Sequence, residues 1–494
     1  MSDIIEHLTS APSRRYASAN KTDEHYDRQL RSLIEYLKQP GLATNDLKGY
    51  LEAIDPAIHS LSFLYLLRVQ VQRLQKNTKL EVPKDMLPGG YLWNHTARFL
   101  RSFDTTQIRY AGHEWRQLVE LVASAGHVSA KPALAVKIIR DALIRLDTSG
   151  VFTSIHLILV KLALRSSSYV YALPVVNELL CHLPLDTGYA SSKSPMCSEH
   201  GSNTAFITDI SGFSTKLTYR DHLKFYLYGA MIYMAVKKWD RASHCLNIAI
   251  SSPAANIVSK IMVEAYKKWI LANLLEHGKL SSTPSLIAPH VTRIYQSLAR
   301  PYISLAEAFE KGDLPRLNAE ANVGQSIWQA DHNAGLVSQV LEAYDKFTIM
   351  KLGRTFSALK MPDVLQRATS CSKDSSEIEE FVTTLVMSNS VKATLSHPSN
   401  DQNTAMLHFS LGTQNNGHHE EYIRARLIER RSAFNAIAQA IVQTDSTLEL
   451  SEENLHFLDK NQKWGAGTEK VVAMGHSEGV GGGDIDEDLM GDGH

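Results

Sequence analysis

Apolar residues recur every three or four positions from about residue 23 to residue 183, which is the spacing of amphipathic α-helices. Tyr26, Leu33 and Leu37, for example, share one helical face before the turn at Pro40-Gly41. Turn residues interrupt the pattern at short intervals, so consecutive helices should pack as antiparallel pairs. A long row of such pairs predicts a helical-repeat solenoid.

The stretch from 184 to 217 breaks this periodicity. Ser, Thr, Gly and Pro fill 16 of the 33 positions from 184 to 216, which predicts a polar flexible insert. Helical spacing returns at about Tyr219, where Ala230, Tyr233 and Ala242 fall close to the positions of a tetratricopeptide (TPR) unit. We therefore expect stacked α-hairpins there, with Tyr233 packed between the helices of one hairpin.

After about residue 352 the pattern changes to shorter elements. Three short helical segments are expected at about 353–358, 361–370 and 376–388. Two β-prone runs follow them, Val391–Leu395 and Met406–Leu411. The two runs are separated by a polar stretch and predict a β-hairpin with a long loop. Helices followed by such a hairpin predict a winged helix with a small wing.

A long helix is expected from about Glu420 to Val442. Five large apolar side chains on it are spaced by four, seven, three and four positions and therefore share one face: Ile423, Leu427, Phe434, Ile437 and Ile441. Little sequence remains to cover this face, and exposed apolar patches usually mark an interface. The five residues are thus the candidate protein-interaction site.

Composition and charge fit a folded, soluble chain of several domains. Charged residues make up 21% and hydrophobic residues 44%, and 51 basic residues nearly balance 52 acidic ones. The last 20 residues contain six acids, seven glycines and no base, which predicts a disordered acidic tail. Four scattered cysteines suit a reducing compartment, and no signal peptide or 18-residue apolar run occurs. We expect cytoplasm and nucleus, with no membrane partner.

Motifs that suggest chemistry are weak. Ser477 lies in a G-x-S-x-G sequence, but only 15 residues follow it, too few to carry the acid and histidine of a hydrolase. Cys181-His182 and Cys197-x-x-His200 could supply zinc ligands, yet the second pair lies in the polar insert. No H-E-x-x-H or P-loop is present. We predict no catalytic residue, no cofactor and no metal site.

The winged helix raises the possibility of DNA binding. Its third helix carries Glu377, Glu379 and Glu380, and no Lys or Arg lies between Lys373 and Lys392. Phosphate charge dominates affinity for DNA, so an acidic helix of this kind would be repelled. We expect protein contacts and no nucleic-acid partner.

Several blocks of sequence resemble the subunit 3 family of the COP9 signalosome. They are Tyr228-Gly229-Ala230-Met231-Ile232-Tyr233, Lys238-Trp239-Asp240-Arg241-Ala242, the run 259–268, Asp331-His332-Asn333-Ala334-Gly335-Leu336-Val337 and Arg354-Thr355-Phe356. The resemblance covers roughly residues 219–411, and at its last block the family enters its PCI domain. Within the run 259–268 we expect Lys267 and Lys268 on a solvated helix face.

The resemblance implies a non-catalytic scaffold subunit of the complex that removes Nedd8 from the cullins of cullin-RING ubiquitin ligases. In that family the chemistry belongs to a JAMM-type zinc metalloprotease subunit, and PCI winged helices associate edge to edge. C-terminal helices gather in a bundle, and this subunit neighbours subunits 1 and 8. The nearest alternative is a PCI scaffold subunit of the proteasome lid or of a translation-initiation-factor complex.

The predicted fold is an all-α helical-repeat (TPR-like) solenoid, followed by a PCI winged-helix subdomain with a small β-hairpin wing and a long C-terminal helix. The expected segments are N-terminal helical repeats over 1–183, the polar flexible insert over 184–217, TPR-like repeats of the PCI region over 218–351, the winged helix over 352–412, the C-terminal bundle helix over 418–445 and the disordered acidic Gly-rich tail over 462–494.

Overall fold

The structure is a computed structural model, and the chain forms two compact units, Met1–Gly412 and Thr413–His494. The predicted acidic tail over 462–494, with Ser477, lies outside the part of the chain that is described. The described residues are 2–13, 22–39, 47–129, 131–147, 150–178, 180, 182–184, 195–198, 206–208, 210–252, 258–368, 375–388, 390–396, 405–409, 417–449 and 456.

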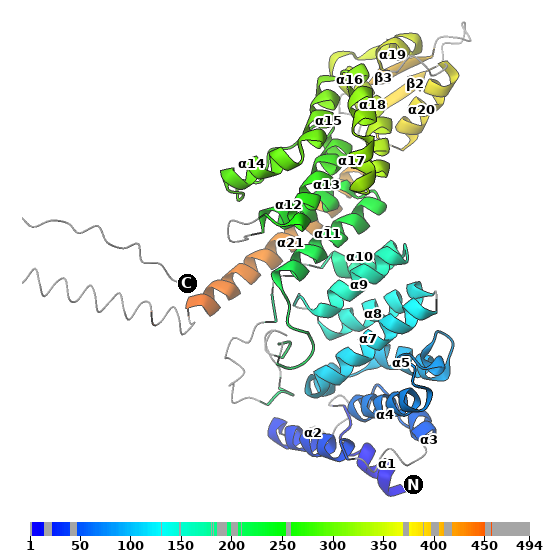
Figure 1. The fold of residues 1–494 in the computed structure, drawn as a ribbon, viewed down its shortest axis with the longest axis vertical. Coiled ribbons are helices and arrows are strands. Elements are labelled where there is room, and N and C mark those ends of the chain that lie inside the picture. The colour runs from blue at the N-terminus through cyan, green and yellow to red at the C-terminus, as the bar shows by residue number, and fades with distance from the viewer. Residues whose placement is uncertain are drawn as a thin grey trace, which may run out of the picture. The chain divides into compact units, whose positions relative to one another are not determined.

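Helices dominate the unit Met1–Gly412 (Figure 1). Its N-terminal elements are α1 Ser2–Leu8, α2 Asp23–Leu37, α3 Leu47–Ala53, α4 Ser60–Thr78, η2 Lys84–Met86, α5 Tyr91–Ser102, α6 Thr105–Ile108, η3 Arg109–Ala111, α7 Gly112–Val128, α8 Pro132–Leu146, α9 Ser154–Arg165 and α10 Tyr169–Val176. They are followed by α11 Tyr219–Ala235, α12 Trp239–Ser251, α13 Lys260–His277, α14 Pro289–Leu298, α15 Arg300–Lys311, α16 Leu314–Val323, α17 Gln325–Ala330 and α18 Ala334–Thr355.

These helices pack mainly on near neighbours in sequence, as stacked repeats do. α7 contacts α8, α8 contacts α9, α11 contacts α12, and α12 contacts α13. α9 and α10 also contact α11, so the row continues across the segment that separates α10 from α11 (Figure 1). One apolar core extends from Leu8 to Phe347 and includes Tyr233, which is 2% exposed as expected for packing between hairpin helices. The prediction of a helical-repeat solenoid is confirmed.

Part of the stretch predicted as a flexible insert contributes to this core. Cys197, Phe206 and Phe213 are buried, and the Cys197 thiol donates to the Asp23 carbonyl at 3.3 Å. The Arg109 guanidinium donates to the carbonyl oxygens of Met196 and Ser198 at 3.0 and 2.8 Å. It also lies 4.2 Å from the centre of the Phe206 ring. Part of the described segment is thus packed against the N-terminal helices.

A second apolar core belongs to the winged helix, whose elements are β1 Ala358–Lys360, α19 Met361–Ala368, α20 Ser375–Met387, β2 Ala393–Ser396 and β3 Met406–Phe409. The strands form an antiparallel sheet in the order β1-β3-β2, with Leu359 and Leu395 both opposite Leu407. The predicted hairpin is confirmed as β2 and β3. The short helix expected over 353–358 is wrong, because α18 continues to Thr355 and β1 follows it.

A polar network joins the repeats to the helix that leads into the winged helix. Lys267 Nζ donates to Asp331 at 2.7 Å, and the Tyr302 hydroxyl donates to the same carboxylate at 2.8 Å. Lys268 is only 4% exposed and is held by Asn333, which is fully buried. The expected solvated face for these two lysines is therefore wrong, because Asp331 and Asn333 lie in the turn before α18 and cover it.

Candidate protein-interaction helix

The long helix α21, Gly417–Glu449, lies in the second unit. Its sequence is rich in Ala, Arg and Glu, residues with high helix propensity, and neither Gly nor Pro occurs after Gly417. At about 1.5 Å per residue, its 33 residues span roughly 50 Å. The helix begins near the expected start and extends several residues beyond the expected end at 445.

All five residues of the candidate site lie on α21 with exposed side chains. The exposed fractions are 44% for Ile423, 62% for Leu427, 69% for Phe434, 41% for Ile437 and 54% for Ile441. Every other α21 side chain that the structure describes is exposed as well. The helix therefore presents large apolar groups that nothing within the described residues buries.

The five side chains form one stripe along the helix. With about 100° of rotation per residue, they fall within an arc of roughly 80°. Ile428 and Val442 are also exposed, each at 64%, but the same geometry places them about 60° or more beyond the edge of this arc. We call Ile423, Leu427, Phe434, Ile437 and Ile441 the apolar stripe.

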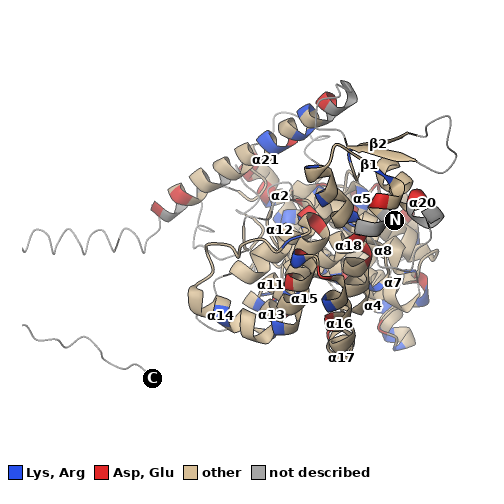
Figure 2. Cartoon of the chain, turned by 90° about the horizontal axis from the view of Figure 1, so that it is seen from above, with Lys and Arg blue, Asp and Glu red and all other residues tan. Residues whose placement is uncertain are grey.

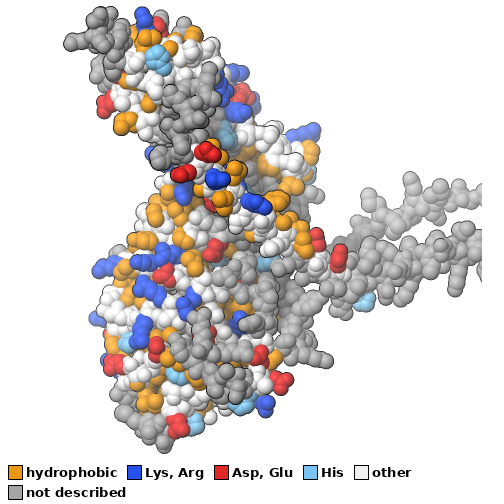
Figure 3. Space-filling view, turned by 180° about the vertical axis from the view of Figure 1, so that it is seen from behind, with side chains coloured by type: hydrophobic (Ala, Val, Ile, Leu, Met, Phe, Trp, Pro, Cys, Tyr) orange, Lys and Arg blue, Asp and Glu red, His pale blue; other side chains and the backbone are white. Residues whose placement is uncertain are grey.

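Charged residues are unevenly distributed along α21. Arg and Glu are concentrated before position 432, and the following turns are uncharged up to Asp445 (Figure 2). Figure 3 shows hydrophobic side chains exposed between these charged groups. A long helix with a narrow apolar stripe and charged flanks can dock against other helices, and coiled-coil and bundle seams have this pattern. The stripe contains no group suited to catalysis.

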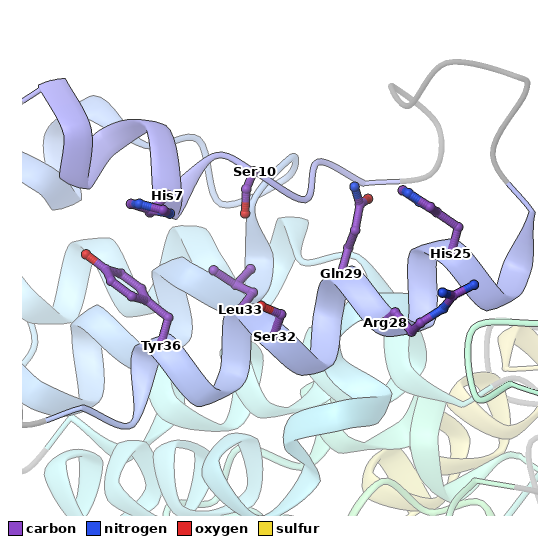
Figure 4. Close-up of a pocket in the computed structure, with 8 residues that line it drawn as sticks. All are labelled: His7, Ser10, His25, Arg28, Gln29, Ser32, Leu33 and Tyr36. Atoms are coloured by element: carbon purple, nitrogen blue, oxygen red, sulfur yellow. The ribbon is translucent and has the colours of Figure 1, made fainter.

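Two polar grooves lie elsewhere in the first unit, and sequence analysis missed both. One, of about 370 Å³, lies between α1 and α2 and is lined by His7, Ser10, His25, Arg28, Gln29, Ser32, Leu33 and Tyr36 (Figure 4). At one end His7 stacks on Tyr36 with ring centres 5.1 Å apart. The other, of about 400 Å³, lies between α12 and α13. Each groove combines residues of two neighbouring helices, so no motif within one helix predicts it.

The third helix of the winged helix, α20, carries two acids that the structure describes. Glu380 is exposed and Glu379 is half-buried, whereas the side chain of Glu377 lies outside the described residues. No Lys or Arg lies on α20.

The described residues include no group of three or more His, Cys, Asp or Glu side chains arranged to hold a metal ion. None of the described helices combines the length and apolar character needed to cross a bilayer. Cys181 and His200 lie outside the described positions, and Cys197 is engaged with Asp23.

Helical repeats that lead into a winged helix, followed by a long helix with an exposed apolar stripe, define a protein of the PCI class. A family model described as "COP9 signalosome complex subunit 3, N-terminal helical repeats" matches residues 24–197 and 204–291. The chain is 63% identical over 495 residues to COP9 signalosome complex subunit 3 of Emericella nidulans, covering 100% of both chains. The chain belongs to the COP9 signalosome subunit 3 family.

More distant relatives carry the same name. The subunit 3 protein of Dictyostelium discoideum is 25% identical over 371 residues, covering 74% of this chain and 79% of the relative. That of Neurospora crassa is 25% identical over 423 residues, covering 83% and 82%. The resemblance drawn from the sequence blocks in 219–411 is thus confirmed.

Proposed function

We propose that this chain is a non-catalytic scaffold subunit of the COP9 signalosome, the complex that removes Nedd8 from cullins in cullin-RING ubiquitin ligases. Its role is to hold neighbouring subunits in place through its PCI winged helix and through α21. The observation that carries the proposal is the apolar stripe of α21, in a chain that belongs to the subunit 3 family.

The partners in this proposal are other signalosome subunits. Subunits 1 and 8 are the expected neighbours, and cullin-RING ligases are engaged indirectly through the complex. The stripe favours helical partners, because its side chains recur at the spacing of a helix-packing seam. Nucleic acid and membrane have no part in the proposal. We place the protein in the cytoplasm and the nucleus.

In this proposal the reaction that removes Nedd8 is catalysed by a different subunit. The apolar stripe offers side chains for packing and contains no nucleophile, general base or metal ligand. The deneddylation step would be carried out by a zinc metalloprotease subunit, and this chain would act on its rate only through assembly.

The experiment compares two double variants in the co-expressed complex. Leu427→Asp with Phe434→Asp places two charges in the stripe, and Ile428→Asp with Val442→Asp places two charges on exposed apolar positions outside it. Burying one large apolar side chain contributes roughly 1.5–3 kcal/mol. Allowing for incomplete burial, the stripe variant should lose about 3 kcal/mol of association free energy, or roughly a hundredfold in affinity.

Size-exclusion chromatography and native mass spectrometry of the purified complex give the readout. We expect the stripe variant to be missing from the complex and neddylated cullin to accumulate in cells that carry it. The control variant should assemble normally. Both variants should keep the wild-type circular dichroism, because the substituted side chains are exposed. Normal incorporation of the stripe variant with unchanged cullin modification would refute the proposal.

A further inference from the structure

The apolar stripe has a gap of seven residues between Leu427 and Phe434, and Arg430 occupies it. With Arg430 included, the spacing along α21 becomes four, three, four, three and four. This is the alternation of the two seam positions in a heptad repeat. At about 100° per residue, Arg430 lies near the centre of the arc that holds the five apolar residues. The helix therefore carries one cation in the middle of its seam.

Arg430 makes no ion pair among the described residues of its own helix. The residues three and four positions away are Arg426, Leu427, Ala433 and Phe434, so no carboxylate is within reach along the helix. Its neighbour Arg431 likewise has no acid at these positions, which are Leu427, Ile428, Phe434 and Asn435. The guanidinium of Arg430 is exposed and available to a partner.

Docking of the stripe would bury the region around this guanidinium. A charge taken out of water without a counter-ion is strongly unfavourable, whereas a paired and hydrogen-bonded one is tolerated. A single polar residue at a seam position is a known way of fixing helix partner and register. Arg suits this use, because its planar fork forms two parallel hydrogen bonds to one carboxylate.

We infer that the helix that packs on α21 presents an Asp or Glu side chain to Arg430, and that this pair selects the partner helix and its register. The inference rests on the proposed function, since it needs the stripe to be an interface. It adds the chemistry of the partner: an apolar seam interrupted by one acid at the level of Arg430. Charge complementarity thus supplies the specificity that five aliphatic and aromatic contacts alone would lack.

The test is a competition for assembly. A tagged variant and an untagged wild-type chain are co-expressed with the remaining signalosome subunits, and their ratio in the purified complex is measured by mass spectrometry. Arg430→Glu should be under-represented at least tenfold, because two carboxylates would then face each other. Arg431→Glu makes the same change in charge about 40° outside the arc and should be incorporated within twofold of wild type.

A second measurement identifies the facing acid. The Arg430→Lys variant in the assembled complex is treated with a carbodiimide, which joins an ammonium and an adjacent carboxylate as an amide with loss of water. We expect a cross-link from position 430 to an Asp or Glu on a helix of another subunit. An Arg431→Lys variant should give no cross-link to that residue.

The outcomes separate this inference from the proposed function. If Arg430→Glu assembles as well as Arg431→Glu while the Leu427/Phe434 double variant is excluded, the stripe is an interface and the acidic partner is wrong. Equal exclusion of the two Glu variants would also overturn the inference, because it would reflect charge on the helix in general. If the Leu427/Phe434 double variant assembles normally, both the proposed function and the inference fail.

Discussion

The ammonium of Lys268 donates to the side-chain oxygen of Asn333 at 2.9 Å, although the two residues are 65 positions apart. Lys268 also reaches Glu264 at 3.1 Å, and Asn333 donates to the Tyr302 hydroxyl at 2.8 Å. Burial alone would raise the pKa of Asp331, but hydrogen bonds from Lys267 and Tyr302 outweigh it and lower that pKa. Together these contacts tie α13 and α15 to the start of α18.

Asn333→Ala should destabilise this junction more than Lys268→Met. The first change leaves a buried ammonium with Glu264 as its remaining hydrogen-bond partner, and a buried charged group that lacks a hydrogen bond costs more than the roughly 1–3 kcal/mol of a neutral one. The second removes the charge and keeps most of the volume, so about 1–3 kcal/mol should be lost from one unpaired amide oxygen. Urea unfolding of the two variants measures the difference. A larger loss for Lys268→Met would contradict the ranking.

Gly278 and Gly312 both end helices in the left-handed conformation, with φ of 68° and 77°. Replacing either glycine by alanine should lower the free energy of unfolding by roughly 1–2 kcal/mol, because a residue with a Cβ is disfavoured in that conformation. A Cβ at Gly278 would lie 2.5 Å from Phe347, whereas at Gly312 the nearest atom is the Tyr344 hydroxyl at 3.8 Å. Overpacking should therefore cost Gly278→Ala a further 1–3 kcal/mol or so. Equal unfolding midpoints for the two variants would contradict this, because they would show that the Phe347 side chain moves away from the new Cβ at little energetic cost.

His156 should make stability depend on pH. It is 2% exposed, and burial lowers its pKa to about 4, against smaller opposing effects from Asp147 and Thr153. Because the unfolded state, with a pKa near 6.5, binds the proton first, this contribution is present above pH 6.5 and is lost as pH falls towards 4. Between pH 7 and pH 5 the free energy of unfolding should drop by about 2 kcal/mol from this residue.

The control for His156 uses its place in a capping box. Its Nδ1 accepts from the Thr153 backbone N–H at 3.1 Å at the start of α9. Glutamine at this position also completes a capping box, and it does not titrate. His156→Gln should therefore lose less stability than wild type between pH 7 and pH 5. Identical pH profiles would exclude His156 as a source of the effect.

The winged helix should not bind duplex DNA. Glu380 is exposed on α20, and this helix carries no Lys or Arg to contact phosphate. In fluorescence anisotropy at about 0.15 M salt, the full chain should show no binding that falls steeply with added salt. Micromolar affinity that weakens with salt would place the chain among nucleic-acid-binding proteins.

Local patterns were sufficient to predict the helical repeats, the β2–β3 hairpin and α21, because helix and hairpin signals lie within short windows. β1 could not be predicted, since a three-residue strand exists only through pairing with β3, nearly 50 positions later. The burial of Lys268 depends on Asn333, which no spacing within α13 reveals. The acids of the tail and Ser477 lie outside the described residues, so the predictions made for them stay predictions.

The apolar stripe shows most clearly what can and cannot be predicted from the sequence of one chain. Its residues follow from their spacing on one helix, and the structure places all five on exposed positions of α21. Under the proposed function, the surface that covers them belongs to other subunits, so it can be read neither from this sequence nor from this fold. In the linear sequence Arg430 stands among other charged residues, and only rotation about the helix axis places it within the seam.

Hydrogen exchange of the α21 amides tests most directly whether this helix is an assembly interface. A helix without tertiary packing opens readily, so peptides covering 423–441 should exchange rapidly in the isolated subunit. In the purified signalosome the same peptides should exchange at least tenfold more slowly, because docking of the stripe holds the helix closed. Equally rapid exchange of 423–441 in the isolated subunit and in the complex would contradict the role assigned to α21.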